Sequence, residues 1–127
     1  MEELIKKHEQ LKALGYNVWI ETLWEWIDHK AELLAKAWEL DSEYRENKVT
    51  LKRDKGMRSM ELKHGKEKIT DKTTDKMVEW IISDEFYEKD INQETLATMY
   101  KLLLDKADNA QEYINVIKLN IKTYTNI

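Results

Sequence analysis

The sequence contains no cysteine, no proline and only three glycines among its 127 residues. The absence of cysteine excludes a disulfide framework and any metal site that needs thiolate ligands. The shortage of proline and glycine argues against a β-sandwich or β-barrel, because the tight turns of those folds depend on these residues. Charged residues make up 36% of the chain, which together with these absences is typical of a helical protein. A chain of this length predicts a single domain, 1–127.

Long apolar runs are also absent. No stretch reaches the roughly 18 uncharged residues that a membrane-spanning helix needs. The first residues, MEELIKKHEQ, are charged and amphipathic, and they lack the apolar region of a signal peptide. We therefore expect a protein that contacts no membrane and is cytoplasmic, which for a viral protein means the host cytoplasm.

Apolar residues recur at helical spacing through most of the chain, which predicts an all-α fold. The expected helices are a short one over 2–14, a long one over 18–63, a short one over 71–82 and a long one over 84–125. The last carries an unbroken heptad seam, which is the coiled-coil pattern. The seam comprises Leu96, Tyr100, Leu103, Ala107, Ala110, Ile114, Ile117, Ile121 and Tyr124. We predict that the two long helices form a long antiparallel, coiled-coil-like hairpin with short accessory helices.

The first half of the helix expected over 18–63 carries two apolar stripes. One comprises Ile20, Trp24, Ile27, Ala31, Leu34 and Trp38, and the other comprises Trp19, Leu23, Trp26, Leu33, Ala37 and Leu40. A helix that packs on one neighbour needs one stripe, so two stripes predict burial on two sides. We expect Trp24 and Trp38 in the core, opposite the alanines of the heptad seam. Trp19, Trp26 and Leu33 then face either residues 4–14 or a second subunit, and in the second case they form the interface of a homo-oligomer.

The formal net charge of −4 is unevenly distributed. Between Lys48 and Met77, ten basic residues stand against five acidic ones, a net +5, so the rest of the chain carries −9. Such a segment predicts an anionic partner, although a solvated helix surface of mixed charge explains it equally well. The candidate nucleic-acid contacts are Lys48, Lys52, Arg53, Lys55, Arg58, Lys63 and Lys66. Several of them recur at helical spacing on one face, where they can follow a phosphate backbone without reading its sequence.

No catalytic pattern is present. The histidines His8, His29 and His64 lie outside any HExxH motif. Glu61 and His64 form one ExxH pair, whereas a di-metal helical bundle needs two such pairs and two further glutamates. The sequence has neither a motif that would activate a serine or threonine nor a glycine-rich loop for phosphate. We expect no enzymatic activity, no cofactor and no metal.

From about Tyr44 onward, the order of features resembles a known family. A helix rich in lysine and arginine leads into LKHGKEKITD, then comes a short helix DKMVEWIIS, and DEFY precedes the long heptad helix. This layout resembles the recombination mediators (UvsY-type) of bacterial viruses, which are small helical proteins. The resemblance implies an oligomer that binds single-stranded DNA and helps a recombinase load there by displacing the single-strand-binding protein. The positions in this chain that the resemblance matches to the family's basic helix are Lys52, Arg53, Arg58 and Lys63.

Two other functions stay open. One is a small viral inhibitor of a host or CRISPR/defence protein. It fits the acidic balance of the chain and the tryptophan-rich first third, which departs from the family's pattern. Such a protein can act by protein–protein binding or by mimicking the charge of DNA in a basic cleft. A structural helical scaffold without a ligand is the third hypothesis.

Overall fold

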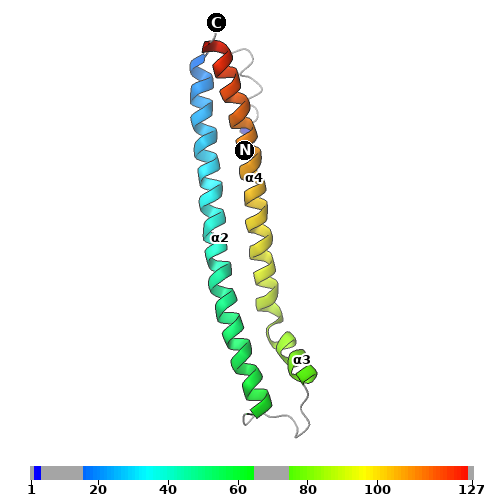
Figure 1. The fold of residues 1–127 in the computed structure, drawn as a ribbon. Helices are drawn as coiled ribbons and strands as arrows, with labels where there is room; N and C mark the ends of the chain where they lie inside the picture. Colours follow the sequence, from blue (N-terminus) through cyan, green and yellow to red (C-terminus); the bar gives the residue numbers. More distant parts are fainter. Residues whose placement is uncertain (1, 4–15, 65–74, 126–127) are drawn as a thin grey trace. The chain divides into compact units, whose positions relative to one another are not determined.

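The computed structural model describes residues 2–3, 16–64 and 75–125. Its helices are α2 (Tyr16–His64), α3 (Asp75–Glu85) and α4 (Tyr87–Thr125), as Figure 1 shows. Within the described ranges, every residue is helical except Phe86, which forms the turn between α3 and α4. The predicted all-α class is confirmed. Most of the short helix expected over 2–14 lies outside the described residues.

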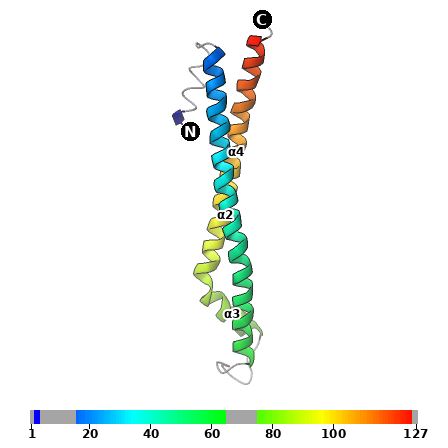
Figure 2. The ribbon, with the colours of Figure 1, turned by 90° about the vertical axis from the view of Figure 1, so that its left-hand side faces the viewer.

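The chain divides into two compact units, and both α2 and α4 contribute a stretch to each. Unit 1 comprises Met1–Trp38 with Tyr100–Ile127, and unit 2 comprises Glu39–Met99. Within each unit, a stretch of α2 lies beside a stretch of α4 (Figures 1 and 2). Residue numbers along the contacts rise on α2 as they fall on α4, so the stretches are antiparallel, as a helical hairpin requires. Whether the two units fold as one domain stays a prediction.

Two tryptophans of α2 and the heptad seam of α4 build the core of unit 1. Trp26 is fully buried and stacks on Tyr113 with ring centroids 4.5 Å apart. Its cluster contains the buried residues Trp19, Ala110, Ile114 and Ile117. Ala110 of the seam thus lies in one cluster with the indoles of Trp19 and Trp26, not with Trp24 or Trp38 as expected. All described side chains of the predicted seam are buried or half-buried, while the side chain of Tyr124 lies outside the description.

The burial of the two apolar stripes of α2 differs from our prediction. Trp24 and Trp38, expected in the core, are 60% and 64% exposed. Trp19 and Trp26, for which core and an interface between subunits were expected about equally, lie in the core of unit 1, and Leu33, expected at the interface, is buried there too. Their stripe has a heptad period in which a lysine, Lys30, takes the place of an apolar residue.

Lys30 explains why the buried stripe looks interrupted in the sequence. Its ammonium group donates a hydrogen bond to Oε1 of Gln111 on α4. A lysine can bury its aliphatic stem in a helix seam while its charged end reaches a polar partner at the edge. The heptad period therefore continues through this position.

His29 lies next to the core of unit 1, with its ring edge-on to Trp26 at 6.1 Å between centroids. Burial lowers the pKa of this imidazole, and the charges of Lys36 and Lys106 lower it further. Glu32 acts in the opposite direction. His29 is half-buried at the edge of this core.

Polar contacts replace much of the apolar core in unit 2. Gln93, which is 9% exposed, donates a hydrogen bond from Nε2 to the backbone carbonyl of Tyr44 at 2.9 Å. The buried apolar side chains here are Leu62, Val78 and Leu96. Hydrogen bonds and ion pairs between α2 and the two later helices accompany these few buried apolar side chains.

Candidate nucleic-acid interface

Three of the predicted DNA contacts form an exposed basic patch on α2, which we define as Lys48, Lys52 and Arg53. Lys48 and Lys52 form no ion pair with any described residue. Arg53 is 69% exposed and its Nε lies 3.5 Å from Oδ1 of Asp54, a loose pair that leaves the guanidinium open to solvent. The patch spans about 7.5 Å along the helix, because an α-helix rises about 1.5 Å per residue.

Three other predicted contacts are already engaged within the chain. Arg58 donates from Nε and Nη2 to the two carboxylate oxygens of Glu85, at 2.7 and 2.8 Å, and from Nη1 to Glu61 at 3.2 Å. Lys63 contacts Asp75 of α3 at 2.8 Å. The two-point pair between Arg58 and Glu85 is of a type that is among the strongest hydrogen-bonded arrangements in proteins.

Lys55 is the third engaged cation. Its ammonium contacts Oδ1 of Asp90 on α4 at 2.7 Å and lies 5.9 Å from the centroid of the Phe86 ring. Lys55, Arg58 and Lys63 thus tie α2 to the two helices that follow it. The seventh candidate, Lys66, lies outside the described residues.

The basic partners lower the pKa of two carboxylates in these pairs. The hydrogen bond from Arg58 holds the pKa of Glu85 below its ordinary value, and the hydrogen bond from Lys63 lowers the pKa of Asp75. Both acids are ionised at neutral pH. A DNA phosphate that approaches Arg58 or Lys63 must therefore displace a charged acceptor that is already in place.

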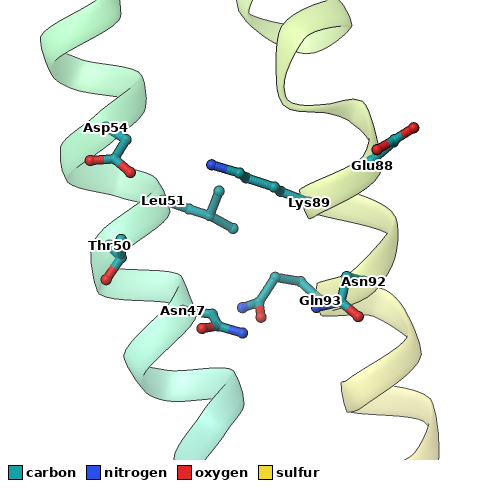
Figure 3. Close-up of a pocket in the computed structure, with 8 residues that line it drawn as sticks. All are labelled: Asn47, Thr50, Leu51, Asp54, Glu88, Lys89, Asn92 and Gln93. Carbon is teal, nitrogen blue, oxygen red and sulfur yellow. The ribbon is translucent and has the colours of Figure 1, made fainter.

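A polar hollow of about 350 Å³ lies between α2 and α4 in unit 2. Figure 3 shows Asn47 and Gln93 pointing toward each other, Lys89 extending toward α2 and Glu88 pointing away. The Oε1 atom of Gln93 is buried and has no hydrogen-bond partner.

Among the described residues, no group of three or more histidine, aspartate or glutamate side chains is placed to hold a metal ion. No described helix is long and apolar enough to cross a membrane.

Trp80 is a surface feature that the sequence reasoning missed. At 81% exposed, it is the most exposed large apolar side chain among the described residues. It lies between two hollows of about 540 and 520 Å³, and Tyr87 lines the second. Its spacing from Val78 is the signal that predicts this exposure. Two residues apart on a helix, the two side chains face opposite sides, and Val78 is buried.

No family model, curated protein or solved structure matches the chain. The resemblance to the recombination mediators stays a prediction.

Proposed function

We propose that this protein is a non-enzymatic, homo-oligomeric accessory protein that binds single-stranded DNA through Lys48, Lys52 and Arg53. The observation that carries the proposal is the exposed basic patch, whose side chains point to solvent while neighbouring cations are paired. Its role, helping a recombinase to load on the strand, comes from the resemblance of residues 44–127 to the mediators.

The chemistry of the patch favours contacts with phosphates. Lysine and arginine side chains on a helix surface neutralise phosphates without reading base edges, so binding is independent of sequence and sensitive to salt. The chain carries a net charge of −4. Its acidic surfaces repel nucleic acid, so strand contacts concentrate at the basic patch.

Fluorescence anisotropy with a labelled oligothymidylate, titrated at low and high salt, tests the proposal. We expect binding at low salt that weakens as salt rises. The triple variant Lys48→Gln, Lys52→Gln, Arg53→Gln should bind more weakly. Its slope of log affinity against log salt should be smaller by about 2, because each phosphate contact on a single strand contributes roughly 0.7.

A matched variant separates the patch from overall charge. Lys101→Gln, Lys106→Gln, Lys118→Gln removes the same charge from exposed positions of α4, and it should bind DNA much as the wild type does. Equal losses in the two variants would show that binding follows net charge alone. An unmodified chain that fails to bind at low salt would rule out DNA binding.

A second candidate is an inhibitor that occupies a basic cleft of a host or defence protein. It is favoured by the exposed indoles of Trp24 and Trp38 on α2 of unit 1. Glu21, Asp28 and Glu32 are exposed beside them. This function predicts an equimolar complex with a purified DNA-binding target, loss of that complex in Trp24→Ala, Trp38→Ala, and no binding to the oligonucleotide.

A further inference from the structure

The outward side of α3 presents an exposed indole between acidic residues. Trp80 projects there, and Glu79 and Asp84 are exposed near it with no ion pair to any described residue. Tyr87, which is 62% exposed, lines the same hollow as Trp80 and Asp84. We call these four residues the α3 face. The exposed Lys76 lines a hollow with Trp80 and Glu79, so two carboxylates stand against one ammonium here. The surface is net negative and repels phosphates, which makes nucleic acid a poor occupant.

A second unpartnered surface lies on α2 of the same unit. Val49, Met57 and Met60 are 72%, 58% and 61% exposed. At helical spacing, Val49, Gly56 and Met60 lie opposite the side that carries Leu51 and Arg58 toward α3 and α4. We define the α2 face by the residues Val49, Lys52, Arg53, Gly56, Met57 and Met60.

Gly56 is the unusual member of the α2 face. A glycine inside a helix costs about 0.5–1 kcal/mol relative to alanine. A Cβ added at Gly56 would meet nothing within 4 Å, so no contact within the described part of the chain requires a glycine there. The missing side chain leaves the helix backbone open at this position, beside two exposed methionines whose flexible side chains adapt to a neighbouring ring.

The two faces are complementary in charge. The α3 face offers a projecting indole with carboxylates beside it, and the α2 face offers open helix backbone at Gly56 with Lys52 and the loosely paired Arg53 beside it. Because Trp80 faces away from Val78 and Gly56 faces away from Arg58, one chain cannot bring its own two faces together. A second copy of the chain can.

We propose that Trp80 of one copy packs over the open backbone at Gly56 of a second copy, with Glu79 and Asp84 opposite Lys52 and Arg53. This inference rests on the homo-oligomer part of the proposed function, and it shares Lys52 and Arg53 with the proposed DNA contacts. Each copy has one face of each kind, so the contact is heterologous and produces a closed ring or an open chain of subunits.

Size-exclusion chromatography with light scattering, on the full chain without DNA, tests the contact. We expect the wild type to elute above the monomer mass, and Trp80→Ala and Gly56→Leu to elute as monomers. Thermal unfolding should show both variants folded, since each position is exposed. The control Trp38→Ala removes an equally large exposed indole from unit 1 and should keep the wild-type mass.

Mixing the two variants tests the heterologous geometry. Trp80→Ala keeps an intact α2 face, and Gly56→Leu keeps an intact α3 face. An equimolar mixture should therefore form complexes of two chains that neither variant forms alone. The charge-reversed variant Glu79→Lys, Asp84→Lys should also be monomeric, and adding Lys52→Glu, Arg53→Glu to the same chain should restore assembly.

Three results would overturn the contact. They are a monomeric wild type, a Trp80→Ala variant that keeps the wild-type mass, and a mixture of Trp80→Ala with Gly56→Leu that stays monomeric. A monomeric wild type that still binds the oligonucleotide would rule out the proposed assembly and would leave the proposed DNA binding standing. Loss of assembly in Trp38→Ala alone would place the interface on unit 1 instead.

Discussion

At the scale of single residues, Trp24 and Trp26 show how strongly two positions on a helix can differ. They are two residues apart on α2, yet Trp26 is fully buried against Tyr113 and Trp24 is 60% exposed. Apolar periodicity predicts burial of both stripes. The fold instead buries the stripe in which Lys30 breaks the apolar run, and it leaves Trp24 and Trp38 of the other stripe exposed.

This difference predicts unequal effects on stability. Trp26→Ala removes a ring from a packed core and should lower the free energy of unfolding by about 3–5 kcal/mol. Trp24→Ala changes an exposed position and should stay within about 0.5 kcal/mol of the wild type. Urea unfolding followed by circular dichroism measures both. Similar losses in the two variants would contradict the burial pattern.

At the scale of elements, ion pairs on two sides of the α3–α4 turn join these helices to α2. Arg58 holds Glu85 at the end of α3, and Lys55 holds Asp90 in the first turn of α4. The helices themselves follow from apolar spacing and could be predicted. The pairs could not, because their formation depends on the register that brings residues about 30 positions apart in sequence next to each other.

The Arg58–Glu85 pair predicts a pH dependence. Arg58 lowers the pKa of Glu85 in the folded state, so the unfolded state binds the proton more readily. The stabilisation is therefore fully present above the unfolded carboxyl pKa of about 4.3 and is lost as the pH falls through the lower folded value. The melting temperature of Glu85→Gln should be lower than that of the wild type at neutral pH, and the difference should vanish in acid.

An exposed carboxylate on α4 provides the control for this prediction. Glu94→Gln removes the same charge and should melt with the wild type across the whole pH range. A constant difference between Glu85→Gln and the wild type at every pH would mean that the pair contributes through packing and not through charge.

At the scale of the whole molecule, the sequence predicts the fold class better than the candidate site. The heptad seam and the scarcity of turn residues are enough for an all-α hairpin. The basic segment suggests a surface of seven cations, yet Lys55, Arg58 and Lys63 are paired with acids and three cations form the exposed patch. Net charge along a sequence does not reveal which charges the fold neutralises.

Lys52 and Arg53 belong both to the basic patch and to the α2 face, and this double membership couples the two proposals. A strand that binds these side chains removes the charges opposite Glu79 and Asp84, so DNA should weaken contacts between copies, and assembly should weaken DNA binding by the same factor. The expected result is negative cooperativity. In anisotropy titrations, the Hill coefficient should be below one for the wild type and should return to one in Trp80→Ala, which cannot assemble.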